Sequence, residues 1–160
     1  SQVLHERSPE QLLAELQPLW TAQGWDPTDG PAAANAGWAH ELCALLGPSL
    51  TTLQDGIEQA RPFFERPELN EAAQQQLASE GARPALAALL ERLPEGGALT
   101  AEAAQGLLGE AVAAAGVKKG VLMKSLRAAL LGSLQGPDLL ATWLLLHRSG
   151  DDRPRIARCL

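Results

Sequence analysis

Four basic residues lie close together in the second half of the chain: Lys118, Lys119, Lys124 and Arg127. Lys124 and Arg127 are three positions apart on a predicted helix, so their charges are neighbours. The two preceding lysines fall at its start, where the helix dipole disfavours cations. Arg127 presents a planar fork of N–H donors that suits a phosphate or a base edge. The cluster predicts an anion-binding surface, although a solvated basic face beside an apolar stripe fits the same pattern.

Residues that usually perform catalysis or bind metals show no matching pattern. The three histidines are scattered, and Cys43 and Cys159 lie far apart without metal-ligand spacing. None of the motifs H-E-x-x-H, G-x-S-x-G or the P-loop occurs. We therefore predict no catalytic centre and no metal site in these residues. The two thiols are expected to be a buried apolar residue and a tail residue in a reducing compartment.

The formal net charge is −6, and it is distributed unevenly along the chain. Residues 1–100 hold 5 Lys and Arg against 14 Asp and Glu, whereas residues 101–160 hold 8 against 5. An acidic total argues against a nucleic-acid partner, but the distribution of charge decides which surface an anion can approach. The second half is where such a partner is expected, although this asymmetry also occurs in proteins without one.

Helices are the elements that must position these side chains. Ala and Leu dominate an apolar content of 46%, and no segment shows the alternation of a strand. Ser8, Thr51 or Thr52, and Thr100 are typical N-caps, and Gly132 is a typical C-cap. We predict an all-α fold with helices beginning near residues 9, 32, 53, 71, 84, 101, 119, 138 and 152.

Proline and glycine mark the predicted breaks between helices. Pro62 is expected to stop the third helix, and the segment 94–97 (PEGG) is the strongest break in the chain. We therefore predict two consecutive helical-bundle subdomains, residues 1–96 and 97–160. No apolar run approaches the roughly 20 residues that span a bilayer, and no secretory segment opens the chain. A first residue other than Met suggests a fragment of a longer protein.

The basic helix and the turn after it resemble the anticodon-binding domain of bacterial-type glutamyl-tRNA synthetases, which are class I aminoacyl-tRNA synthetases. In that family a stretch similar to K-G-x-x-x-x-x-L-R-x-A-L-T-G precedes a turn with proline and a Leu-rich helix. Departures are Ser125, where proline is usual, and Leu131, where threonine is usual. The matching residues are Lys119, Gly120, Leu126, Arg127, Ala129, Leu130, Gly132, Gly136, Pro137 and Leu139.

Two further segments resemble the same enzymes less specifically. Residues 38–64 are similar to the preceding helical subdomain, and residues 155–160 are similar to the closing helix. Together the matches cover most of the chain and imply the α-helical cage type of fold at the C-terminal end of such a synthetase. The family's catalytic portion, with its HIGH-like and KMSKS-like sequences, is absent from these residues.

The resemblance implies a role in reading the tRNA anticodon, a single-stranded loop whose bases can be splayed out and read on their edges. By position, Arg127 would contact an anticodon base, and the segment Gly136–Leu139 would pack against bases. Lysines beside them would neutralise phosphates. Gly136 and Pro137 equally suit a helix entry, and Leu139 equally suits a core leucine. The residues predicted to bind nucleic acid are Arg127, Lys119, Lys124, Leu126, Gly136, Pro137 and Leu139.

Gly47 carries a separate hypothesis. Some family members place an arginine near this helix break to exclude glutamine tRNA, whose anticodon differs from that of glutamate tRNA at its third base. Residues 46–50 here contain no basic residue. The pocket could therefore accept both tRNAs, as in a non-discriminating enzyme. Gly47 equally suits a simple helix C-cap.

The resemblance also implies partners and cofactors. The expected partner is glutamate tRNA, together with glutamine tRNA if the enzyme is non-discriminating. ATP and magnesium are implied for the full-length enzyme, and no cofactor is expected in these residues. We expect a cytoplasmic monomer that binds neither DNA nor membranes. The competing interpretations are a helical protein–protein interaction module and, more remotely, a helix-turn-helix DNA-binding protein that uses residues 119–131.

Overall fold

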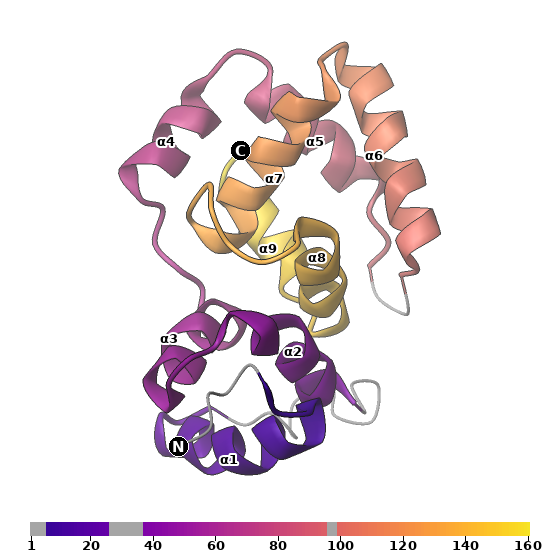
Figure 1. Cartoon of the computed structure of the whole chain (residues 1–160). Helices are drawn as coiled ribbons and strands as arrows, with labels where there is room; N and C mark the ends of the chain where they lie inside the picture. The colour runs from indigo at the N-terminus through magenta and orange to yellow at the C-terminus, as the bar shows by residue number, and fades with distance from the viewer. Residues whose placement is uncertain (1–5, 26–36, 96–98) are drawn as a thin grey trace. The chain divides into compact units, whose positions relative to one another are not determined.

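The computed structural model describes residues 6–25, 37–95 and 99–160. Its regular elements in these ranges are helices (Figure 1), and none of the described residues forms a strand. The predicted all-α fold is therefore confirmed. The chain divides into two compact units, Ser1–Glu65 and Arg66–Leu160, and each is described by itself.

Two helices of the first unit, α1 and α3, begin at predicted caps. The hydroxyl oxygens of Ser8 and Thr52 accept hydrogen bonds from the backbone N–H groups of Gln11 and Asp55, at 3.2 and 3.1 Å. These caps satisfy N–H groups that have no partner inside the helix. Buried leucines on the facing sides of the helices supply much of the core. The elements are α1 (Pro9–Ala22), α2 (Trp38–Leu46), the 3₁₀ helix η2 (Gly47–Ser49) and α3 (Leu53–Phe64).

Aromatic rings complete the core of the first unit around Phe64. The centroid of its ring lies 5.2, 4.9 and 5.4 Å from those of Trp20, Trp25 and Trp38. Trp25 is 7% exposed, and its indole N–H donates to Glu65 Oε2 at 2.7 Å. Trp25 is therefore a core residue and is not free to stack on a nucleic-acid base, although it follows a helix end.

The third helix does not stop where the sequence predicts. It continues through Pro62 to Phe64. A proline here loses one backbone hydrogen bond, but the burial of Phe63 and the ring contacts of Phe64 hold the last turn in place. The second helix is described from Trp38 onward, and its predicted start near residue 32 lies outside the described residues.

The second unit is organised around α7, which contacts α4, α5, α6, α8 and α9 (Figure 1). These neighbouring helices cover its sides, so that Leu122, Leu126, Ala129 and Leu130 are fully buried. Thr100 caps α6, and Gly132 ends α7 in the left-handed conformation, as predicted. The helices of this unit are α4 (Glu71–Ala78), α5 (Ala82–Arg92), α6 (Ala101–Ala115), α7 (Lys119–Leu131), α8 (Leu139–Arg148) and α9 (Asp152–Ala157).

The boundary between the two units along the chain differs from the predicted subdomain boundary. The division falls between Glu65 and Arg66 and not between residues 96 and 97. The physical reason is that α5 packs against α6, α7 and α9, so residues 66–95 share a core with the end of the chain. The glycines at 96 and 97 lie outside the described residues.

Arginines near the end of the chain bind carbonyl groups of neighbouring helices. Arg155 is 1% exposed and donates to the Leu130 carbonyl and to Asp151 Oδ2, both at 2.6 Å. Arg153 donates to the Leu93 carbonyl at 2.7 Å. Carbonyls at a helix C-terminus carry partial negative charge, so these cations stabilise the ends of α7 and α5. Some of the basic residues that make the second half positive therefore stabilise the fold and are not available to a ligand.

Asp151 forms ion pairs with Arg66 and Arg155, and these pairs should make stability depend on pH. Burial raises the pKa of this carboxyl, but hydrogen bonds from Arg66 and Arg155 outweigh it, and the net pKa lies below the usual value. A lowered folded-state pKa gives stabilisation that is present above the unfolded pKa of about 4 and is lost as the pH falls through the folded-state value. We expect Asp151→Asn to cost about 1–2 kcal/mol at pH 7.

Urea titrations at several pH values, followed by the indole N–H resonance of Trp143 in the second unit, would measure this cost. The difference between the wild-type protein and Asp151→Asn should shrink as the pH is lowered below 4. Asp138→Asn is the matched control, because Asp138 is an exposed N-cap and asparagine caps a helix equally well. A difference that stays constant from pH 7 to pH 3 would contradict the ion pairs as its source.

Candidate nucleic-acid interface

Helix α7 separates an apolar side from a basic side. Its buried side includes Leu122 and Leu126, whereas Lys118, Lys119 and Lys124 are exposed. Lys118 occupies the N-cap position without a side-chain cap hydrogen bond. This arrangement places the three ammonium groups in solvent, where they can meet an anion, and Lys119 Nζ also reaches Gln105 Oε1 of α6 at 3.4 Å.

Arg127 links α7 to the turn that precedes α8. Its Nη1 donates to the Pro137 carbonyl at 2.8 Å, and its side chain is half-buried. This bond uses one of the five N–H donors of a guanidinium. The guanidinium plane is therefore held in one orientation at the edge of the turn while most of its donors remain for solvent or a ligand. No acidic side chain pairs with Arg127 in the described part of the chain.

Gly136 allows the turn to approach this arginine closely. Its φ is +148°, and a Cβ built there would lie 2.7 Å from Leu131 Cδ1 and 3.4 Å from Arg127 Nη1. Pro137 follows with its fixed φ, and Asp138 caps α8 by accepting the N–H of Ala141 at 2.9 Å. The bend is therefore both narrow and stiff.

Gly136→Ala should consequently disturb the turn. The φ is unfavourable for an alanine, and the methyl group would press on the Leu131 side chain, so we expect a cost of about 1–3 kcal/mol. The observable is the arginine Nε–Hε resonance of Arg127, which should broaden or shift as the bond to Pro137 weakens. Gly120→Ala is a suitable control, because a Cβ at this exposed position of α7 has nothing within 4 Å. An unchanged Arg127 resonance would show that the turn tolerates a side chain.

Two leucines predicted to bind nucleic acid are core residues. Leu126 is 0% exposed and Leu139 is 5% exposed. Both lie on apolar stripes that face neighbouring helices, so neither offers surface to a base. The apolar spacing of the sequence already favours a core role for both leucines. Their burial contradicts the base contacts that the resemblance suggested. Leu126 and Leu139 are therefore core residues and not contacts for a nucleic acid.

Gly47 is also an internal residue. It is buried, and a Cβ there would lie 2.8 Å from Leu12 Cδ1. A side chain at this position would point into the core of the first unit, so Gly47 itself cannot be where an arginine reaches a tRNA. Its exposed neighbours Pro48 and Ser49 carry no charge.

Sequence reasoning missed the part that Ser125 plays. This residue departs from the proline that is usual in the family and is fully buried. Gln76 Nε2 of α4 donates to its hydroxyl at 3.2 Å, which ties α4 to α7. The bond between Arg127 and Pro137 was also missed, because nothing in the sequence links a helix residue to a particular carbonyl ten positions later.

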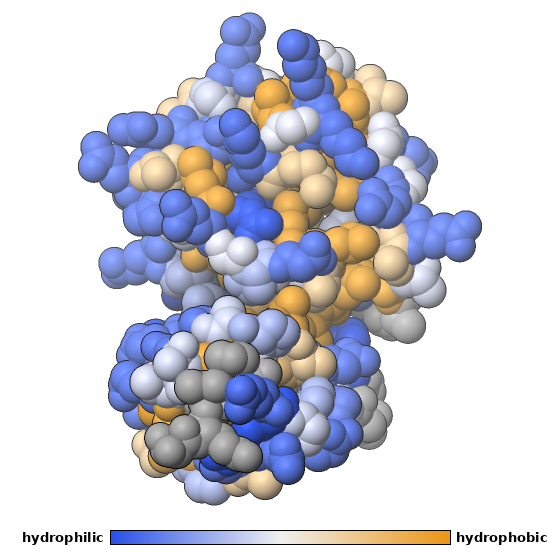
Figure 2. Space-filling model, in the orientation of Figure 1, coloured by the Kyte–Doolittle hydropathy of each residue, from blue (hydrophilic) through white to orange (hydrophobic). Residues whose placement is uncertain are grey.

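The surface that includes this region mixes polar and apolar side chains. On the face shown in Figure 2, hydrophilic side chains of the second unit surround patches of apolar surface. Leu134, Leu140 and Leu144, which are in or after the turn, are half-buried. A nucleobase has a polar edge and an apolar face, so a surface of both kinds beside a guanidinium suits an unstacked base.

The described residues show no sign of a metal centre. No group of three or more His, Cys, Asp or Glu side chains in residues 6–25, 37–95 and 99–160 could hold a metal ion. Across the same ranges, the helices are all too short or too polar to cross a bilayer.

Comparison with known proteins identifies the family. The model of the family described as "Anticodon binding domain" matches residues 11–153. The glutamate–tRNA ligases of Synechococcus sp. (strain CC9311) and Prochlorococcus marinus (strain MIT 9303) are 59% and 53% identical to the chain over 162 residues. The alignments cover all of the chain and 33% of each ligase. The chain belongs to the anticodon-binding-domain family, and the predicted resemblance to glutamyl-tRNA synthetases is confirmed.

Solved structures share the fold. A glutamate tRNA ligase from Elizabethkingia meningosepticum CCUG26117, crystallised in complex with its amino acid, matches with a TM-score of 0.79 at 22% identity. The match covers 98% of this chain and 30% of that one. The glutamate-tRNA synthetase of Elizabethkingia anophelis matches with a TM-score of 0.74. This chain thus spans about a third of the length of the curated ligases that it matches.

Proposed function

We propose that these residues bind the anticodon loop of a tRNA as part of a glutamate–tRNA ligase. The single observation that carries the proposal is the geometry of Arg127, which is held at the bend by the Pro137 carbonyl with most of its donors free and with no acidic partner in the described residues. A planar donor set fixed beside a narrow turn can read the acceptor edge of a base that leaves the stack.

The exposed lysines of α7 would supply affinity without sequence preference. Lys119 and Lys124 stand in solvent on the helix that carries Arg127. Contacts from such ammonium groups to phosphates release counterions and weaken as salt is added. Arg127 and the turn would thus determine which loop is preferred, and the lysines would determine the affinity that all loops share.

The chemistry of ligation would reside elsewhere in the longer protein. ATP and magnesium would be held by the parts of the ligase beyond these 160 residues, and this domain would act by positioning the tRNA. We place the protein in the cytoplasm as a monomer. The alternative of a protein–protein interaction module is not favoured, because the family model covers residues 11–153.

Binding of anticodon stem-loops to the 160-residue chain tests this function. The glutamate tRNA stem-loop should bind more tightly than a stem-loop of the same length with a scrambled loop, and both should bind more weakly as salt is raised. A DNA duplex of equal charge is the control for electrostatics alone. Equal affinity for all three ligands at each salt concentration would overturn the proposal.

We further propose that the domain accepts the anticodons of both glutamate and glutamine tRNA. The support is the absence of a basic side chain near the helix break, where an arginine could exclude one of the two anticodons. Residues 46–50 contain no basic side chain, and the exposed residues among them, Pro48 and Ser49, are uncharged. Stem-loops that differ only at the third anticodon base should bind with affinities within about threefold of each other. A preference of tenfold or more for the glutamate loop would contradict this proposal and leave anticodon binding itself intact.

A further inference from the structure

Two arginines of the second unit differ from the others in how their donors are used. Arg66, Arg153 and Arg155 bind protein acceptors at 2.8 Å or less. Arg158 makes a longer hydrogen bond to the Ala129 carbonyl, at 3.4 Å, and lies beside the Cys159 thiol. Arg83, in the first turn of α5, makes no hydrogen bond or ion pair within the described ranges. Guanidinium groups carry five donors each, so both leave most of their donors unsatisfied by protein.

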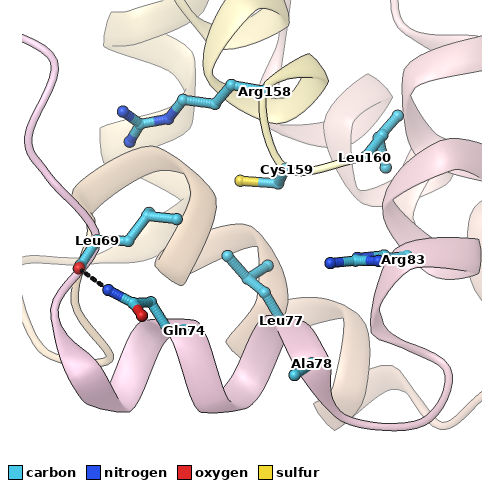
Figure 3. A pocket seen from close by; sticks show the side chains of 8 residues that line it. All are labelled: Leu69, Gln74, Leu77, Ala78, Arg83, Arg158, Cys159 and Leu160. Atoms are coloured by element: carbon cyan, nitrogen blue, oxygen red, sulfur yellow. Dashed lines mark hydrogen bonds between the residues drawn. The ribbon is translucent and has the colours of Figure 1, made fainter.

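Both of these arginines line one cavity of about 290 Å³. It lies among α4, the start of α5 and the segment after α9 (Figure 3). In the close-up, the Arg83 side chain extends from α5 toward the middle of the cavity, Arg158 stands at its edge, and Leu77 and Cys159 lie between them. The lining residues are Leu69, Gln74, Leu77, Ala78, Arg83, Arg158, Cys159 and Leu160, and no acidic side chain is among them.

The two positive charges act on the same point inside the cavity. Burial raises the pKa of the Cys159 thiol, and the charges of Arg158 and Arg83 oppose that rise. Both guanidinium groups are therefore close enough to favour a negative charge beside the sulfur. Arg83 and Arg158 are both exposed, so solvent and salt screen each charge, and an anion gains here because it meets two cations at once.

We propose that this cavity binds a phosphate monoester, with its phosphoryl group in the space that Arg83 and Arg158 line. A phosphoryl dianion, whose second pKa is near 6, matches the two guanidinium charges at neutral pH. Leu69, Leu77 and Ala78 give the remaining space an apolar wall, so an ester with an apolar or aromatic body fits better than the free ion. The site shares no residue with the turn at Arg127 and Pro137, and it stands independently of the proposed anticodon binding.

Titration of the 160-residue chain with phenyl phosphate, followed by amide NMR, tests the proposal. Resonances of residues around the cavity, such as Leu77, Ala78 and Cys159, should shift and saturate. Inorganic phosphate should shift the same resonances at higher concentration, because it lacks the apolar body. Sodium chloride at matched ionic strength is the blank. Shifts that do not saturate, or that the blank reproduces, would overturn the proposal.

Matched variants assign the site to its arginines. Arg83→Gln and Arg158→Gln should each weaken phenyl phosphate binding about tenfold, the loss expected for one charge-assisted pair. Arg92→Gln is the control, because Arg92 is on the same helix as Arg83, lies outside the cavity and donates to the Ala88 carbonyl. Unchanged affinity in both cavity variants, with circular dichroism spectra like that of the wild-type protein, would refute the assignment.

A competition experiment distinguishes two sources of the phosphoryl group. A short RNA with a 5′-phosphate should displace phenyl phosphate if the natural ligand is an RNA end, and the same RNA with a 5′-hydroxyl should not. Failure of both RNAs to displace phenyl phosphate points to a free phosphorylated small molecule. Both results agree with a monoester site. Equal displacement by both RNAs would mean that phosphodiesters suffice, and it would refute the preference for a monoester.

Discussion

Arg127→Lys should abolish most of the preference among anticodon loops while leaving the salt dependence of binding nearly unchanged. Lysine keeps the charge but has no planar fork, so it cannot hold the Pro137 carbonyl and a base edge in fixed directions together. A bidentate base contact is worth about 1–3 kcal/mol of discrimination. The glutamate stem-loop should lose affinity by that amount, and the scrambled loop should lose little. Fluorescence anisotropy with labelled stem-loops at two salt concentrations provides the measurement.

Lys124→Ala is the control for this substitution, because Lys124 is three residues away on the same helix and is exposed. It should weaken all loops alike and reduce the slope of log affinity against log salt by about one. If Arg127→Lys and Lys124→Ala both caused small losses that are independent of loop sequence, Arg127 would be a phosphate contact only. The turn would then need another residue to select a loop.

Local sequence signals predicted those helix ends that depend on a cap, because the atoms that form a cap are close in the chain. The cap at Ser8 needs only the residue three positions later, and Gly132 ends α7 through its own φ of +68°. The C-terminal bound of α7 follows from this signal alone. The same holds for the exposed lysines, which the apolar stripe of α7 leaves facing solvent.

Features that depend on distant partners could not be predicted. Trp25 looks like a loop residue until Phe64 and Glu65, some 40 positions later, are placed against it. The break at residues 94–97 marks the end of a helix, but whether it also divides two cores depends on what α5 packs against. The burial of Leu139 likewise depends on its neighbours in the folded unit. The resemblance to the family could suggest a base contact at position 139, but it could not show that the Leu139 side chain faces the core.

Asp152 gives the largest effect on stability that we expect, because its carboxylate is buried and satisfies several donors at once. It is 1% exposed. Its Oδ2 accepts the indole N–H of Trp143 at 3.1 Å and lies 2.8 Å from His147 Nδ1, and its Oδ1 accepts the Arg153 N–H at 2.9 Å. His147 is buried too, and its Nε2 has no partner in the described residues, so Asp152 is what compensates for burying that ring.

Asp152→Ala should therefore cost about 3–5 kcal/mol, since it leaves an indole and an imidazole without their acceptor in the interior. That is a large share of the roughly 5–15 kcal/mol that holds a domain together. Asp152→Asn should cost less, because one amide oxygen still accepts the Trp143 N–H. Urea titration followed by the Trp143 indole resonance reports on the second unit alone, whereas fluorescence would mix in the tryptophans of the first. Asp138→Ala, an exposed cap, should cost only about 1 kcal/mol. If Asp152→Ala cost no more than this control, the packing of α8 and α9 would not depend on the buried carboxylate.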